Sequence, residues 1–261
     1  MKIDYTTVTE IAGDEVSQEQ IQRLCNRYYW AEKYLMNKDV VEVACGSGQS
    51  LGFLKKASKT FEAGDYSDEL LAMARSHYGD RIKLLKIDAH QMPFNDNSKD
   101  VIVFFEAIYY LNEIERFMQE CKRILRPNGI LLVATANKDL YDFNPSPFSY
   151  KYYGVIEMHD LFLKHGFETE FFGDTPIATL SLRQKALRPI KKMVVQLKLI
   201  PKSMAGKKFI KKLVFGGLTQ MPAEISEKTC PHIDPDPISS QIANTSHKAI
   251  FCKATLINRS H

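Results

Sequence analysis

Short apolar runs alternate with longer amphipathic stretches through residues 17–176. Apolar runs of this length predict buried strands, and apolar residues at three- and four-residue spacing predict helices. The expected strands lie at 39–44, 60–65, 82–87, 101–105, 130–135 and 167–172, with a last one at 248–256. The expected helices lie at 17–36, 49–57, 113–125 and 156–164, and a further one begins after the capping residue Ser67. The turn 126–129 is expected to end the helix at 113–125.

Strands that alternate with helices predict parallel βαβ units with right-handed crossovers. Most of the apolar runs contain few polar residues, which is typical of strands that are covered on both faces. The expected fold class is therefore α/β, with a doubly wound and mostly parallel sheet. In such sheets ligands bind beyond the carboxyl ends of the strands, so the residues at those ends are the candidates for chemistry.

The most informative stretch is VVEVACGSGQS, residues 40–50. It reads as a buried strand, a tight glycine turn and the start of a helix. Backbone N–H groups at such a turn can meet a polar ligand, and glycine lets that ligand approach closely. Glu42 lies within the apolar run, where an acid must be paired. Two interpretations stay open: Glu42 meets polar groups near a ligand, or it is an internal cap that holds the turn.

Carboxylates also follow the next two predicted strands. Asp65 ends the second strand, where it can accept hydrogen bonds from both hydroxyls of a ribose. The alternative role for Asp65 is to cap the next helix, but Ser67 can do that. Asp88 follows the third strand, and its side chain with the N–H of Ala89 can match the edge of an adenine. The alternative for Asp88 is an ordinary surface turn, in which His90 is expected to be exposed.

The charge of the chain is unevenly distributed. Residues 1–179 contain 20 Lys and Arg against 27 Asp and Glu, whereas residues 180–261 contain 15 against 4. The five cysteines are scattered, without a C-x-x-C pair, which indicates reduced thiols and neither a disulfide framework nor a metal site. No apolar run is long enough to span a membrane, and the first residues lack a signal-peptide core, so a cytoplasmic protein is expected.

Five segments together resemble the successive motifs of the class I S-adenosylmethionine-dependent methyltransferases, over residues 20–176. They are EVACGSG (42–48), GDYSDELLAMAR (64–75), KIDAHQMPF (86–94), DVIVFFEAIYYL (100–111) and LRPNGILLV (125–133). The resemblance implies a seven-stranded Rossmann-like sheet whose last strand is antiparallel, and S-adenosylmethionine as cofactor. A dinucleotide-binding fold fits less well, because Leu51 stands where G-x-G-x-x-G requires its third glycine.

The resemblance also implies roles for single residues. The methionine part of the cofactor would be lined by Glu42, Ala44 and Gly46. The ribose would be held by Asp65, the adenine would lie against Tyr66, Asp88 and Ala89, and Phe105 would lie near the sulfonium. Ala44 stands where the family more often has glycine, which is tolerable if its φ is negative. Tyr110 stands where many members have histidine, so no histidine base is expected there.

The acceptor is expected beside the strand ends. Glu106 and Tyr109 follow the fourth strand and Asn137 follows the fifth, so these three are the candidate catalytic residues. A base is needed only if the acceptor must lose a proton. Arg27 has two open interpretations, as the partner of the cofactor carboxylate or as a solvated arginine.

The expected organisation is an N-terminal helical lid at 1–36, a cofactor-binding core at 37–176, a basic insertion or lid at 177–247 and the last core strand at 248–261. The insertion could close over an acidic substrate, or lie on anionic lipid through residues 183–215, whereas nucleic acid is not expected. The predicted function is N- or O-methylation of a small molecule, of natural-product, sugar or nucleotide-sugar type. One alternative is an enzyme that binds the same cofactor but catalyses another reaction, such as cyclisation. The other is a non-catalytic docking subunit. The oligomeric state stays open.

Overall fold

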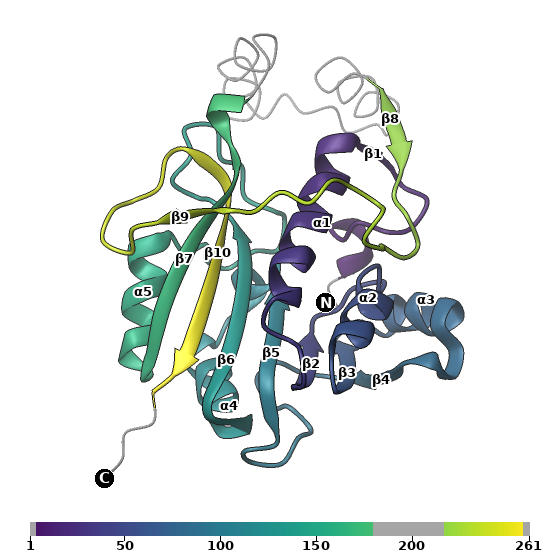
Figure 1. The fold of residues 1–261 in the computed structure, drawn as a ribbon, viewed down its shortest axis with the longest axis horizontal. Coiled ribbons are helices and arrows are strands. Elements are labelled where there is room, and N and C mark those ends of the chain that lie inside the picture. The colour runs from purple at the N-terminus through teal and green to yellow at the C-terminus, as the bar shows by residue number, and fades with distance from the viewer. Residues whose placement is uncertain (1–3, 180–216, 258–261) are drawn as a thin grey trace.

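The computed structural model describes residues 4–179 and 217–257 (Figure 1). The main sheet has eight strands in the order β4-β3-β2-β5-β6-β10-β7-β9. Their bounds are β2 Asp39–Val43, β3 Thr60–Asp65, β4 Lys83–Lys86, β5 Lys99–Phe105, β6 Leu125–Ala136, β7 Phe167–Pro176, β9 Asp236–Ile238 and β10 His247–Leu256. A second, two-stranded sheet pairs β1, Glu15–Ser17, with β8, Leu218–Gln220.

The helices carry the remaining regular structure. The α-helices are α1 Gln18–Glu32, α2 Leu51–Ala57, α3 Asp68–Tyr78, α4 Ile114–Ile124 and α5 Val155–Lys164. The 3-10 turns are η1 Tyr5–Thr7, η2 Gly79–Arg81, η3 Ile108–Tyr110 and η4 Ile177–Thr179. Within the described ranges, no helix is long and apolar enough to cross a membrane.

The sheet topology confirms the predicted fold class. Strands β4, β3, β2, β5 and β6 pair in parallel, and β10 lies antiparallel between β6 and β7. These seven strands are the seven that the sequence predicts. The eighth, β9, adds an antiparallel edge to β7 and contains Pro237, which an edge strand tolerates.

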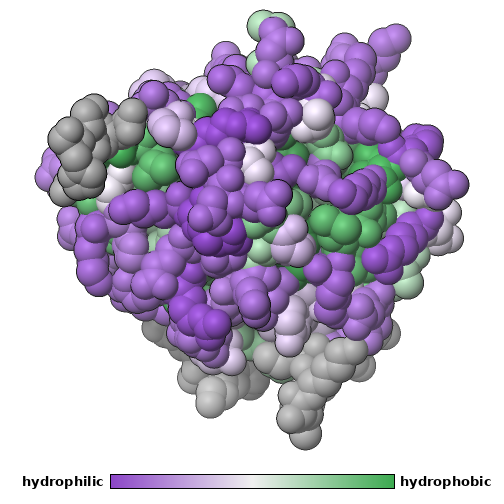
Figure 2. Space-filling model, turned by 90° about the horizontal axis from the view of Figure 1, so that it is seen from below, coloured by the Kyte–Doolittle hydropathy of each residue, from purple (hydrophilic) through white to green (hydrophobic). Residues whose placement is uncertain are grey.

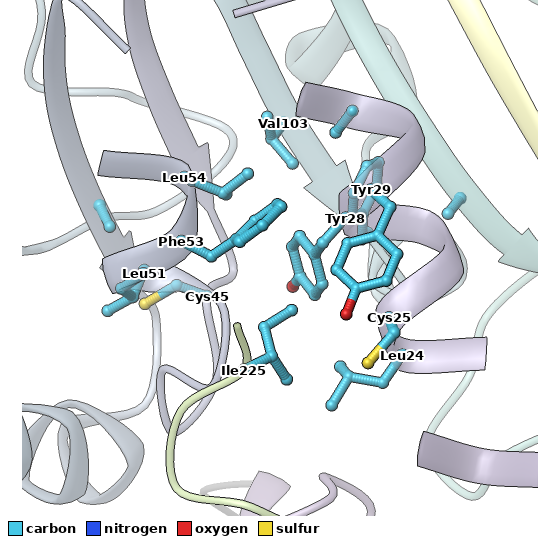
Figure 3. Close-up of a cluster of buried hydrophobic side chains, with 14 of the residues drawn as sticks. Leu24, Cys25, Tyr28, Tyr29, Cys45, Leu51, Phe53, Leu54, Val103 and Ile225 are labelled. Atoms are coloured by element: carbon cyan, nitrogen blue, oxygen red, sulfur yellow. The ribbon is translucent and has the colours of Figure 1, made fainter. Parts of the chain in front are cut away.

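The near-continuous apolar runs arise because helices cover both faces of the sheet. In β5, Val101, Val103 and Phe105 face the layer of α1, α2 and α3, whereas Ile102 and Phe104 face the layer of α4 and α5. Figure 3 shows the first layer, where α1 side chains face the apolar side chains of α2 and Ile225 of the C-terminal part. Each face of the sheet therefore has its own apolar core.

Local signals in the sequence explain where two of the helices begin. Ser17 and Gln20 form a capping box at the start of α1, and Ser67 accepts a hydrogen bond from the backbone N–H of Leu70 at the start of α3. The turn 126–129 was predicted to separate a helix from a strand. Instead β6 begins at Leu125, directly after α4, and residues 126–129 bulge out between its paired positions.

The described part of the predicted insertion packs against the core. Met221, Ile225 and Cys230 are buried in the same cluster as α1. Tyr29 of α1 donates a hydrogen bond of 2.6 Å to the carbonyl oxygen of Ser226. Residues 180–216, which carry most of the predicted basic lid and membrane-contact segment, lie outside the described residues.

The face at which the parallel strands begin is mainly hydrophilic. Figure 2 views the molecule from below, and polar residues cover most of that face, with hydrophobic residues visible in separate areas between them. The polar residues that the sequence placed at the carboxyl ends of the strands lie at the opposite edge of the sheet.

Trp30 joins α1 to the centre of the sheet, and its removal should strongly destabilise the fold. Its side chain is buried with its ring centroid 5.2 Å from that of Phe251 and 5.7 Å from that of Phe172. Trp30→Ala should lower the free energy of unfolding by about 3–5 kcal/mol, because it leaves a cavity. Urea unfolding followed by circular dichroism measures this change. Met36→Ala is the control, since Met36 is exposed; equal losses in the two variants would contradict the role of Trp30.

Candidate functional site

A cavity of about 680 Å³ opens at the carboxyl ends of β2, β3, β4 and β5. This volume lies within the usual range for small-molecule sites. One wall is α1, the floor is made by the strand ends, and the N-terminal segment around η1 forms a third side. The cavity therefore lies where the topology of a parallel sheet predicts a ligand.

The glycine turn after β2 brings backbone to the cavity surface. Ala44, Gly46 and Gly48 have φ angles of 60°, 59° and 95°. A methyl group at Gly46 would lie 3.2 Å from the Cγ2 atom of Thr9, which is tighter than an ordinary contact, so Thr9 would have to shift to admit a side chain there. The condition of a negative φ at Ala44 is not met: Ala44 adopts the left-handed conformation itself, at some cost in backbone strain.

Asp65 connects the glycine turn to the start of α3. Its Oδ2 accepts a hydrogen bond of 2.8 Å from the N–H of Gly46, and its Oδ1 accepts one of 2.8 Å from the N–H of Ser67. Burial raises the pKa of Asp65, and these backbone donors oppose the rise. Each carboxylate oxygen keeps a second lone pair, so Asp65 can still accept hydrogen bonds from two ligand hydroxyls.

The turn after β4 forms the next part of the cavity wall. Asp88, Ala89 and His90 line it, and Tyr66 lies at its edge with the Lys86 ammonium 5.2 Å from its ring centroid. The prediction that His90 is exposed is wrong: only 17% of its side chain is accessible, and its Nδ1 lies 2.8 Å from Asp88 Oδ1. Its buried Nε2 has no hydrogen-bond partner among the residues that the structure describes.

The end of β5 contributes a connected group of polar side chains. The Tyr109 hydroxyl donates a hydrogen bond of 3.1 Å to Glu106 Oε2, and Arg27 Nη1 lies 3.6 Å from Glu106 Oε1. Burial and the nearby Glu106 raise the pKa of Tyr109 well above its usual value, so Tyr109 stays protonated at neutral pH. Glu106 has a φ of 52°, a strained conformation that aims its side chain into the cavity beside Phe105.

Two of the predicted site residues lie away from the cavity lining. Glu42 is fully buried, and it accepts hydrogen bonds of 2.7 Å from the Tyr28 hydroxyl and 2.9 Å from the Ser50 hydroxyl. This geometry matches the internal-cap interpretation, since Tyr28 stands between Glu42 and the cavity. Asn137 donates hydrogen bonds to the carbonyl oxygens of Asn244 and His247, so its side chain fixes the end of β6 to β10.

The N-terminal segment contributes site residues that the sequence did not indicate. The carbonyl oxygen of Glu10 accepts hydrogen bonds from Gln49 Nε2 at 2.6 Å and from Ser47 Oγ at 3.3 Å, which holds residues 4–12 across the glycine turn. The ring of Tyr5 packs edge-on against Tyr110, with centroids 5.5 Å apart. The sequence gives no sign of this contact, because Glu10 makes it through its backbone carbonyl oxygen, which every residue has.

The sequence matches known proteins over the same region. Residues 41–133 match the family model described as a methyltransferase domain. A protein of Mycobacterium tuberculosis described as a probable S-adenosylmethionine-dependent methyltransferase is 31% identical over 134 residues, which cover 50% of this chain and 48% of that protein. The ubiquinone biosynthesis O-methyltransferase of Pelagibacter ubique is 26% identical over 115 residues, 43% of this chain and 48% of that enzyme. The chain thus spans about half the length of these relatives.

Solved structures share the fold over most of the chain. A SAM-dependent methyltransferase from Archaeoglobus fulgidus superposes with a TM-score of 0.57 at 14% identity, covering 92% of this chain and 94% of that one. The phosphoethanolamine N-methyltransferase 2 of Haemonchus contortus, solved with S-adenosylmethionine, superposes with a TM-score of 0.52 at 14% identity, covering 89% of this chain and 52% of that one. At these identities the likeness is one of fold.

The burial of Glu42 should make stability depend on pH. Burial raises the pKa of Glu42 from 4.5 to about 7, so the folded chain keeps a proton that the unfolded chain releases between these values. The contribution of Glu42 to stability is therefore largest below pH 4.5 and is lost as the pH rises through 7, by about 3 kcal/mol.

Glu42→Gln should remove this dependence, because the amide can accept from Tyr28 without ionising. Urea unfolding of the wild type and the variant at pH 5 and pH 8 measures the difference. The variant should gain stability relative to the wild type as the pH rises. Parallel pH profiles would contradict a carboxyl with a raised pKa at this position.

Proposed function

We propose that this chain, whose residues 41–133 match the family model described as a methyltransferase domain, transfers a methyl group from S-adenosylmethionine to a nitrogen or oxygen of a small molecule. One observation carries the proposal. Residues at or just after three strand ends, Gly46, Asp65 and Asp88, line one cavity together with the polar group of Glu106 and Tyr109.

The cavity fits the cofactor in its donors and acceptors. Thr9 and Gly46 line the part of the cavity over the glycine turn, where the methionine part would lie. Asp65 offers two acceptors for the ribose hydroxyls. The Asp88–Ala89 turn, with the unpaired Nε2 of His90, offers polar atoms to the edge of the adenine. Arg27 is paired with Glu106 and Glu10 through its Nη atoms, and its Nε is the donor that it could still offer to the cofactor.

The bound cofactor supplies a methyl group on a sulfonium, which is already activated for transfer. The residues of the cavity would hold the acceptor nitrogen or oxygen in line with that methyl group, and a hydroxyl acceptor would lose its proton to a nearby base. The residues of this chain therefore mainly orient the acceptor and exclude water, which can lower the barrier by several kcal/mol. Glu106 can accept the proton, because Arg27 and Tyr109 hold its carboxylate toward the cavity.

The ribose role of Asp65 is tested by cofactor affinity. Asp65→Asn keeps the size of the side chain and removes its charge and one acceptor. It should weaken the binding of S-adenosylhomocysteine by about 1–3 kcal/mol. Isothermal titration calorimetry measures this affinity, and Asp68→Asn on the exposed surface of α3 is the control. Unchanged affinity would remove Asp65 from the site, and a wild type that does not bind S-adenosylhomocysteine would refute the proposed function.

The positioning role of Tyr109 is tested by turnover. Tyr109→Phe removes the hydrogen bond that orients Glu106, so kcat should fall about tenfold while the affinity for S-adenosylhomocysteine stays unchanged. The assay is a screen of phenols and amines with methyl-labelled S-adenosylmethionine, and Tyr141→Phe, at an exposed tyrosine, is the control. Equal turnover would exclude Tyr109 as a positioning residue, and a parallel loss of cofactor affinity would assign it to the cofactor.

A further inference from the structure

One face of α1 lines the cavity over several successive turns. Gln20, Arg23, Leu24, Arg27 and Tyr28 all lie on it, at the three- and four-residue spacing of one helix face. Two of these residues are arginines, so the wall opposite the strand ends is cationic. The two arginines are four residues apart, which separates them by about 6 Å along the helix axis.

The charge of Arg27 is balanced within the protein. Its Nη1 lies 3.6 Å from Glu106 Oε1, and its Nη2 lies 3.9 Å from Glu10 Oε2. Glu10 also accepts a hydrogen bond of 3.1 Å from Gln20 Nε2, so the side chain of Glu10 is fixed along α1. Arg27 therefore belongs to a local network of carboxylates.

Arg23 differs from Arg27 in this respect. It lines the same cavity and is half-buried, yet no described residue forms an ion pair or hydrogen bond with its guanidinium. Its Nε is shielded from water and has no hydrogen-bond partner. Native proteins leave few buried N–H groups without an acceptor, and each such group calls for an explanation. A bound anion would satisfy both the charge and this donor.

The position of Arg23 on α1 indicates which ligand it meets. With 3.6 residues per turn, Arg23 and Tyr28 lie about 140° apart around the helix axis. Tyr28 faces Glu42 and Ser50 on the side of the glycine turn, and Arg27 lies between the two directions and contacts Glu106. Trp30, seven residues after Arg23 and about 20° from it around the axis, packs on Phe251 of β10 and Phe172 of β7. Arg23 therefore lies on the side of the cavity away from the glycine turn, which is the acceptor side in the proposed function.

Aromatic side chains also line the acceptor side. Tyr109 and Tyr110 meet there in a T-shaped contact with centroids 4.6 Å apart, and Tyr152 stacks on the buried Tyr109 at 4.2 Å, so Tyr110 is the more accessible of the two lining rings. Aromatic side chains favour an acceptor that packs against rings. The same half of the cavity thus offers an aromatic ring, a carboxylate on Glu106 that can accept a proton, and an unpaired cation on Arg23.

We propose that Arg23 binds the carboxylate of a hydroxylated aromatic acid, and that this acid is the methyl acceptor. The proposal rests on the proposed function, because it assigns the substrate class of the same cavity. In this arrangement the ring of the acid packs on the tyrosines, its hydroxyl faces Glu106 and its carboxylate receives the guanidinium N–H groups of Arg23.

The test uses the full chain saturated with S-adenosylhomocysteine, so that the carboxylate of the cofactor is already bound. Calorimetric titrations compare 4-hydroxybenzoate with 4-hydroxybenzamide, which has the same shape without the charge. The wild type should bind the acid about ten- to a hundredfold more tightly than the amide. Arg23→Gln should abolish that preference. A wild type that binds neither compound, or that shows no preference, overturns the proposal, as does a preference that survives in Arg23→Gln.

Arg116→Gln is the matched control. Arg116 lines the same cavity, but its Nη1 is paired with Glu113 Oε2 at 3.1 Å, so its loss should leave the preference for the acid in place. Arg23 could bind the carboxylate of the cofactor or that of the acceptor. Titration of S-adenosylhomocysteine into each variant distinguishes these two roles. A loss of S-adenosylhomocysteine affinity in Arg23→Gln would assign Arg23 to the cofactor and overturn its role at the acceptor. Failure of the wild type to bind S-adenosylhomocysteine would instead refute the proposed function.

Discussion

The carboxylate of Asp65 determines the shape of the cavity floor. Its two oxygens accept hydrogen bonds from the backbone N–H groups of Gly46 and Ser67, which follow two different strands. The turn after β2 and the start of α3 are thereby fixed relative to each other. A buried carboxylate is stable here because backbone donors replace the water that it loses. Asp65 also lines the cavity, and in the proposed function its remaining lone pairs accept hydrogen bonds from the ribose.

Helix α1 connects this floor to the core of the protein. Trp30 and Tyr29 of α1 enter the apolar layer, and Arg23, Arg27 and Tyr28 of the same helix line the cavity. Since α1 is packed against the sheet, its cavity-lining residues have little freedom to move. The positions of the two arginines are thus set by the packing of the helix that carries them. Rigid support of this kind is what a binding site needs to orient a ligand.

The sequence predicted the parts of the site that depend on backbone position. Gly46, Asp65 and Asp88 follow apolar runs, and the ends of parallel strands meet at one edge of a sheet, so these residues could be placed before the structure was known. Glu42 and Asn137 could not be placed in this way, because the direction of a side chain depends on partners such as Tyr28 and His247, which are distant in sequence. The left-handed conformation of Ala44 was missed because alanine gives no sign of it. Strands β8 and β9 are too short for a periodic pattern.

Strand β10 has a consequence for synthesis of the chain. It lies between β6 and β7 and pairs with both along most of its length, yet it follows both in the sequence. A ribosome releases residues in order, so β6 and β7 emerge long before the strand that joins them. Until then each presents an open edge, and such edges associate readily with other chains. Completion of the sheet therefore waits for the last of its strands, and a growing chain would benefit from chaperone protection during that interval.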